Sequence, residues 1–174
     1  PETAILVMDE AYYEYVEDPE YPDSVALVRE GRNVLVLRTF SKIYALAGLR
    51  MGYGVTTPEL AAAMDAVREP FNVSSLAQVA AVESLADTAQ VARTRQLNAE
   101  SRERFYRGFK ELGLRYTPSY ANFVWADMGR ECRSVFVELM RRGVIVRTGD
   151  VFGAPTHIRV TTGTPEQNER FLVA

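Results

Sequence analysis

The chain has 174 residues, enough for one ordinary domain or two small ones with a hydrophobic core. Hydrophobic residues make up 47%, charged residues 25%, and the formal net charge is -3, so neither disorder nor electrostatic attraction to nucleic acid is indicated. No apolar run approaches the roughly 20 residues that cross a bilayer, and no basic leader with a cleavage site is evident. We therefore expect a cytoplasmic protein that acts on small molecules or contacts other proteins.

The chain contains one cysteine, Cys132, and one histidine, His157. A single cysteine excludes an intrachain disulfide and any multi-cysteine zinc site. No serine or cysteine lies in a nucleophile-elbow pattern, so serine-hydrolase and histidine-metal chemistry are not expected. If the chain is an enzyme, its chemistry must come from Lys, Asp, Tyr and Arg, which points to a bound cofactor.

The first part of the sequence predicts a βαβ unit. An apolar run at 4–8 ends in Asp9, residues 24–31 predict a short helix, and residues 33–37 predict a second strand. Apolar runs without alternation are typical of strands covered on both faces, as in a parallel sheet. Asp9 and Lys42 would then follow the carboxyl ends of parallel strands, the edge where open α/β sheets bind ligands.

Further elements follow in chain order. A third strand is predicted at 51–56, and a helix that Pro58 opens is predicted next. Ser75 is the candidate cap of an alanine-rich helix that ends near Leu85. The remaining predictions are a long charged helix at 88–112, strands at 122–126, 144–146 and 157–161, and helices at 132–142 and from Pro165 onward. The first part therefore predicts an α/β fold, and the second an α+β fold with shorter strands.

Lys42 is the most informative residue of the chain. A lone lysine after a strand is usually a solvated loop charge. Here residues 43–49 carry no charge, so we expect a partly buried lysine, and desolvation favours its neutral, nucleophilic amine. Thr39, Ser41 and Arg50 surround it with two hydroxyls and one guanidinium, a natural set for a phosphate dianion.

Four other side chains have both a structural and a chemical interpretation. Asp9 is either a cap for the segment that follows it or a buried carboxylate that holds a cationic ring nitrogen. Tyr12 either packs in the core or presents its phenol to the same ligand. Arg147 and Arg159 are either surface residues or two groups that hold one anionic part of a substrate, and spacing alone leaves both interpretations open.

Several motifs lie in one order along the whole chain. They are Asp9-Glu10-Ala11-Tyr12, Arg38-Thr39-Phe40-Ser41-Lys42, Leu46-Ala47-Gly48-Leu49-Arg50-Met51-Gly52-Tyr53, Ala121-Asn122-Phe123, and Ile158-Arg159-Val160-Thr161-Thr162-Gly163-Thr164 with Asn168. Together they resemble the pyridoxal-phosphate aminotransferases of the aspartate aminotransferase superfamily. The closest likeness is to the histidinol-phosphate aminotransferases.

This resemblance implies that the cofactor is pyridoxal 5'-phosphate. Lys42 matches the lysine that binds the cofactor aldehyde and later moves a proton between Cα and C4′. Asp9 matches the aspartate that keeps the pyridine nitrogen protonated, and Tyr12 matches the tyrosine that hydrogen-bonds the 3′ oxygen. The positions that match phosphate-binding residues are Thr39, Ser41 and Arg50.

The resemblance also implies the substrate contacts. Arg159 matches the arginine that binds the substrate phosphate in one half-reaction and the glutamate carboxylate in the other. Arg147 matches a second anion contact, and Asn122 matches a substrate-binding position. We therefore expect transamination between histidinol phosphate and 2-oxoglutarate or glutamate in histidine biosynthesis. A cytoplasmic homodimer is expected, with no nucleic-acid or membrane partner.

Members of this family carry a further N-terminal region of comparable size. The resemblance thus implies the C-terminal part of the cofactor-binding large domain at 1–86 and a small C-terminal domain at 87–174. Such a fragment is expected to bind cofactor weakly and to turn over poorly by itself. Ala45 lies where glycine is frequent in the family. An aromatic aminotransferase, a decarboxylase of the same fold and a non-catalytic, aminotransferase-like sensor module stay open as alternatives.

Overall fold

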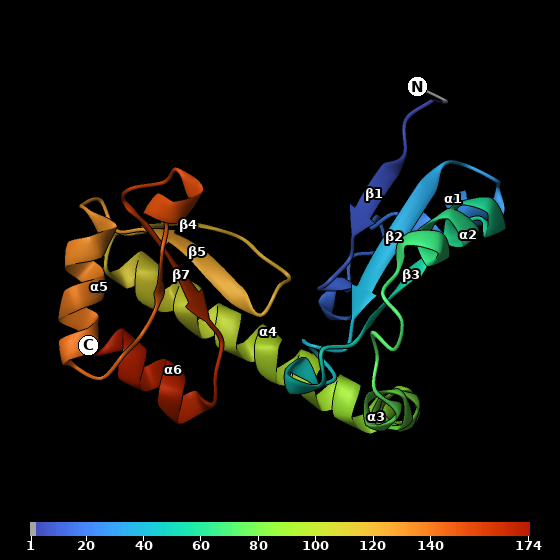
Figure 1. Ribbon diagram of the computed structural model, residues 1–174. Coiled ribbons are helices and arrows are strands. Elements are labelled where there is room, and N and C mark those ends of the chain that lie inside the picture. Colours follow the sequence, from blue (N-terminus) through green and yellow to red (C-terminus); the bar gives the residue numbers. More distant parts are fainter. Residues whose placement is uncertain (1–2) are drawn as a thin grey trace. The chain divides into compact units, whose positions relative to one another are not determined.

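The computed structural model describes residues 3–174, which divide into two compact units (Figure 1). The first unit runs through Ala92, and the second comprises Arg93–Ala174. Within the described residues, each unit contains one β-sheet, with three strands in the first unit and four in the second. Within the described residues, no helix combines the length and the apolar character that a membrane crossing requires.

The first unit begins with the predicted βαβ arrangement and continues with helices. Its elements are β1 (Leu6–Asp9), η1 (Tyr13–Tyr15), α1 (Ser24–Arg29), β2 (Val34–Thr39), η2 (Ala47–Leu49), β3 (Gly52–Val55), α2 (Pro58–Val67) and α3 (Ser75–Ala86). Strands β1 and β2 are parallel, with Asp9 opposite Leu37, and β3 runs antiparallel to β2. The parallel pair that the sequence predicts is therefore confirmed.

The two parallel strands differ in how far they are covered. Strand β2 lies between its neighbours, and Val34 and Val36 in it are buried. Strand β1 lies at the edge of the described sheet, and Leu6 and Val7 are each 52% exposed. Coverage on both faces, expected for both strands, was therefore wrong for β1, because burial depends on neighbouring elements as well as on the apolar run.

Local signals placed the helix starts to within one residue. Pro58 opens α2 as predicted, because its missing N–H costs nothing in the first turn. The cap of α3 is Ser74, whose hydroxyl accepts a hydrogen bond from the backbone N–H of Ala77, whereas Ser75 was expected. Asp23 caps α1 in the same way.

The second unit is an antiparallel sheet with helices. Its elements are α4 (Thr88–Glu111, from Arg93 on), β4 (Arg115–Thr117), β5 (Phe123–Asp127), α5 (Cys132–Arg141), β6 (Arg147–Thr148), η3 (Asp150–Phe152), β7 (His157–Thr161) and α6 (Pro165–Leu172). The predicted strand at 144–146 lies instead at β6, and β4 was not predicted. The reason is that Gly143, with φ of +78°, and Val144, which donates to the carbonyl of Leu139, complete the end of α5.

The core of the second unit lies on one face of its sheet. Alternate residues of β5 and β7 point to this face and are buried, and they pack with apolar side chains of the helices. The buried members are Phe105, Phe109, Val124, Ala126, Cys132, Val135, Leu139, Val146, Ile158, Val160 and Phe171. The residues between them on the strands, Trp125 and Arg159 among them, point to the opposite face.

Candidate active site

Asp9 lies at the carboxyl end of β1, as the sequence predicts. Its side chain is exposed, and its Oδ1 accepts a hydrogen bond of 3.2 Å from the backbone N–H of Ala11. This contact forms a local turn, whereas the residue at the start of η1 is Tyr12, so the helix-cap interpretation of Asp9 was wrong. Tyr12 is half-buried and lies directly before η1.

Lys42 follows β2 in a tight turn between two buried anchors. Phe40 is 3% exposed and Ile43 is fully buried, so the backbone on each side of Lys42 is fixed in the core. The Lys42 Nζ atom lies 5.2 Å from the centroid of the Tyr12 ring. No carboxylate within residues 3–174 forms an ion pair with this amine. The structure therefore brings Lys42 and Tyr12 together at one edge of the sheet.

The predicted phosphate-binding residues lie in the same unit. The Thr39 hydroxyl donates to the carbonyl of Met51 and accepts from the backbone N–H of Ser41, at 3.4 and 3.1 Å. Arg50 is exposed, has φ of +54°, and donates from Nη1 to the carbonyl of Ala47 at 2.7 Å. Because a guanidinium has five N–H donors, most of the donors of Arg50 stay available for an anion.

The second unit places Arg147 and Arg159 directly opposite each other on β6 and β7. Within the described part of the chain, neither guanidinium forms an ion pair, and the buried Nε of Arg159 has no hydrogen-bond partner. The Cζ atom of Arg147 lies 5.9 Å from the centroid of the Phe152 ring, and that of Arg159 lies 5.0 Å from the centroid of the Phe123 ring. Two adjacent cations without a carboxylate are suited to bind one anionic group.

Asn122 directly precedes β5, next to the end of β7. Its backbone carbonyl accepts hydrogen bonds from both the N–H and the hydroxyl of Thr162, at 2.9 and 3.0 Å. The same hydroxyl donates to the side-chain oxygen of Asn98 at 2.8 Å, and Asn98 is 4% exposed. A buried polar network of this kind fixes the backbone from which the Asn122 side chain projects.

Sequence reasoning overlooked a charged cluster behind the edge of the first sheet. Glu10 is 2% exposed, and its carboxylate forms an ion pair with Arg38 at 2.9 Å. Burial raises the pKa of Glu14 nearby, and burial also raises the pKa of Tyr44 to about 12. Glu10 and Arg38 both lay in the quoted motifs. Each of these charged residues follows the end of a predicted parallel strand. This position could have predicted that Glu10 and Arg38 form an ion pair.

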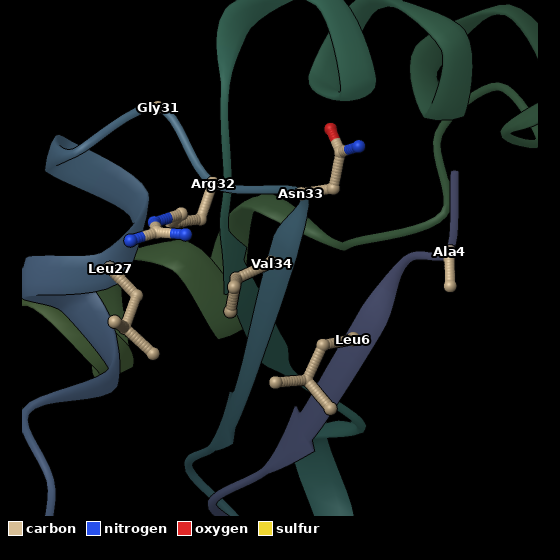
Figure 2. A pocket seen from close by; sticks show the side chains of 7 residues that line it. All are labelled: Ala4, Leu6, Leu27, Gly31, Arg32, Asn33 and Val34. Atoms are coloured by element: carbon tan, nitrogen blue, oxygen red, sulfur yellow. The ribbon is translucent and has the colours of Figure 1, made fainter. Parts of the chain in front are cut away.

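A cavity of about 810 Å³ lies at the opposite ends of β1 and β2 (Figure 2). Leu6, Leu27 and Val34 line it from β1, α1 and β2, and Arg32 is the one charged residue of its lining within the described part of the chain. The Arg32 guanidinium pairs with Glu30 at 3.6 Å. Among the described residues, this lining holds no nucleophile and no carboxylic acid.

In the first unit Asp9 ends one parallel strand and Lys42 follows the other, and the second unit is an antiparallel sheet with two opposed arginines. The sequence profile of the family described as aminotransferase class I and II matches residues 2–174. The chain belongs to this family, and the resemblance seen in the motifs is confirmed.

Individual relatives show which members of the family this chain is similar to. The chain is 54% identical to the histidinol-phosphate aminotransferase of Moorella thermoacetica over 175 residues, which cover 100% of this chain and 45% of that protein. The structure of the Sinorhizobium meliloti histidinol-phosphate aminotransferase in complex with pyridoxal-5'-phosphate matches at 35% identity with a TM-score of 0.91. That match covers 100% of this chain and 48% of the other. The chain therefore spans about half the length of the relatives it matches.

The fold is shared more widely than one activity. The L-threonine-O-3-phosphate decarboxylase of Porphyromonas gingivalis matches with a TM-score of 0.81 at 24% identity, over 96% of this chain and 52% of that chain. At this level of identity the likeness concerns the fold alone. Reaction type must therefore be argued from the site and from the more similar relatives.

Proposed function

We propose that the protein transfers an amino group between histidinol phosphate and 2-oxoglutarate, with pyridoxal 5'-phosphate as cofactor. The observation that carries this proposal is the similarity over the whole chain to a protein named histidinol-phosphate aminotransferase, at 54% identity. A neighbouring structure at 35% identity is described as a complex with the same cofactor. We also propose that residues 1–86 belong to the cofactor-binding large domain and residues 87–174 to the small domain.

The groups at the edge of the first sheet fit this cofactor. The edge offers an amine for the cofactor aldehyde, and this amine has no ion-pair partner in the described residues. It also offers a carboxylate for the ring nitrogen, a phenol for the 3′ oxygen and a guanidinium for the phosphate. These groups belong to Lys42, Asp9, Tyr12 and Arg50, with the hydroxyls of Thr39 and Ser41. When bound, pyridoxal 5'-phosphate supplies an aldehyde that takes up the amino group and a ring that accepts the electron pair released at Cα.

Each of these side chains then has a defined task. Lys42 would hold the aldehyde carbon, and its free amine would move a proton between the substrate Cα and the cofactor C4′. The Asp9 carboxylate would lie beside the ring nitrogen and hold a proton there. Tyr12, whose ring centroid lies 5.2 Å from the Lys42 amine, would donate from its phenol to the 3′ oxygen. The hydroxyls and Arg50 would bind the phosphate dianion.

The opposed arginines of the second unit suit the two substrates. Histidinol phosphate carries a phosphate, and glutamate carries two carboxylates, so both bring an anion to the site. Arg159 and Arg147 bind that anion, and Asn122 contributes a hydrogen bond to the substrate. Because a guanidinium pairs with phosphate and carboxylate in the same bidentate geometry, one site accepts both. We further propose that the enzyme acts as a homodimer in the cytoplasm.

Covalent trapping tests the cofactor assignment. Sodium borohydride reduction of the whole protein with pyridoxal 5'-phosphate, followed by peptide mapping, should place the label on Lys42. The chain has one other lysine, Lys110, which is exposed and serves as an internal control. Label on Lys110 alone, or no label in this chain, contradicts the proposal. The variant Lys42→Arg lacks the primary amine that reacts with the aldehyde and should lose the label.

Substrate preference tests the reaction. The whole protein should transfer the amino group from histidinol phosphate to 2-oxoglutarate with a higher kcat/KM than from phenylalanine. Threonine phosphate should yield no carbon dioxide. A preference for phenylalanine would indicate an aromatic aminotransferase, and release of carbon dioxide would indicate a decarboxylase. Either result overturns the proposed reaction.

A further inference from the structure

We propose that Arg38, held by Glu10, is a positioning residue that fixes the segment with Asp9 and Tyr12 against the strand that leads to Lys42. This inference rests on the proposed function, because the groups it positions are the proposed cofactor contacts. Arg38 itself needs no contact with the cofactor. Its role is to set the distance between groups that do make such contacts.

The ion pair closes the ladder of the two parallel strands. Asp9 pairs with Leu37 as the last partners of β1 and β2, and the Glu10 backbone N–H donates to the Leu37 carbonyl at 2.8 Å. The side chains then continue the connection, because Nε and Nη2 of Arg38 both donate to Oε2 of Glu10 at 2.9 Å. In this ion pair, Glu10 directly follows Asp9, and Arg38 directly precedes Thr39.

The same guanidinium also reaches the segment that carries Tyr12. The Cζ atom of Arg38 lies 3.7 Å from the centroid of the Tyr13 ring, and Tyr13 begins η1. Arg38 therefore contacts the residue after Asp9 and the residue after Tyr12. On its other side it is paired in register with Tyr53 of β3. Arg38 thus connects three segments that border the Lys42 edge, two through its side chain and the third through strand pairing.

Stability alone is a weak explanation for this pair. Its side chains are 1% exposed at Glu10 and 15% at Arg38, and the buried Oε1 of Glu10 has no hydrogen-bond partner. Taking two charges out of water costs free energy, and apolar residues of similar volume often stabilise a protein as well or better. A fork-shaped, stacked guanidinium does fix geometry more tightly than apolar contacts do. The cluster therefore fits a role in holding the edge in one arrangement.

The test separates positioning from stability with a paired apolar replacement. In the whole protein, Arg38→Met leaves the Glu10 charge buried alone and should lower the unfolding temperature. The double variant Glu10→Leu with Arg38→Met removes both charges and should regain most of that loss. We nevertheless expect it to bind pyridoxal 5'-phosphate about 10- to 100-fold more weakly, the range typical of groups that orient direct ligand contacts. Equilibrium dialysis measures this affinity.

A second readout does not need the cofactor. Amide hydrogen exchange of the cofactor-free double variant should be faster at 10–15 and 38–42 than in the wild type, with no change at α6. The matched control is Glu30→Gln with Arg32→Met, an exposed pair at the far end of β2, which should change neither quantity. Arg38→Lys retains the charge without the fork, so it should keep the fold and still bind the cofactor more weakly.

The outcomes distinguish the two proposals. Wild-type cofactor affinity and wild-type exchange in the double variant would mean that the pair is only structural, and the inference fails. If the double variant does not fold, the same two measurements on Arg38→Lys decide the matter. A wild-type protein that takes up no cofactor on Lys42 refutes the proposed function, whereas faster local exchange in the variants still supports the positioning of the edge.

Discussion

Arg147 on β6 and Arg159 on β7 face each other directly across the sheet of the second unit. Like charges in this relation destabilise a sheet by about 0.2–1 kcal/mol. Ring contacts with Phe152 and Phe123 offset part of this cost. An anion bound between the two guanidinium groups would turn the repulsion into attraction.

Replacing Arg147 tests this relation. Arg147→Met should leave the stability of the ligand-free protein unchanged or raise it by up to about 1 kcal/mol, because the repulsion is relieved. The same variant should raise KM for histidinol phosphate about 10- to 100-fold, the loss expected for a hydrogen bond to a charged group. Urea denaturation and steady-state kinetics measure the two effects. Arg141→Met, which breaks an exposed pair with Glu138, is the control and should change neither.

Asp9 should matter more for turnover than for binding. Asp9→Asn keeps the hydrogen bond from the Ala11 N–H but removes the carboxylate that we propose lies beside the ring nitrogen. We expect kcat to fall roughly 10²-fold, as for other preorganised electrostatic contacts, with a smaller change in KM. Asp23→Asn is the control, since asparagine caps α1 as well as aspartate does. A rise in KM with unchanged kcat would contradict the assigned role.

The backbone at Ala45 predicts a stabilising substitution. Ala45 has φ of +57°, in the left-handed region, which costs a residue with a Cβ about 1–2 kcal/mol. Ala45→Gly removes this cost but adds backbone entropy to the unfolded chain, so we expect a net gain of about 0.5–1 kcal/mol. Ala47→Gly, at a position without positive φ, should instead destabilise the protein. Thermal unfolding of both variants measures the difference, and equal effects would refute the argument.

Asp127 should contribute to stability above pH 4. Its carboxylate accepts a hydrogen bond from the Gly129 N–H and forms an ion pair with Arg115. Together with a hydrogen bond from the Thr156 side chain, these contacts lower the pKa of Asp127 to about 2. A lowered carboxyl pKa gives stability that is present above the unfolded value of 3.8 and is lost as the pH falls towards 2. Asp127→Asn should therefore be less stable than wild type at pH 5, and the gap should narrow between pH 4 and pH 2. Denaturation curves across this range test it, and a constant gap would be the contrary result.

Local signals predicted most elements of the fold. Apolar runs gave β1 and β2, Pro58 and Pro165 gave the starts of α2 and α6, and alternation gave β7 at its observed limits. These features depend on a few neighbouring residues, so a window of sequence contains them. The position of β6 depends on more than neighbouring residues. The apolar residues that are most typical of a strand directly follow Gly143, and the first of them completes the end of α5.

Some features of the candidate site could likewise be predicted from the sequence, and others depend on the tertiary structure. The sequence by itself determined the chemical groups: Lys42 before an uncharged segment, its hydroxyl neighbours, and Asp9 at the end of an apolar strand. Only the tertiary structure decided that Arg147 faces Arg159 and that Arg38 binds Glu10, 28 positions away. Strand register and buried ion pairs join residues that are distant along the chain, and their partners are fixed by packing rather than by local propensity.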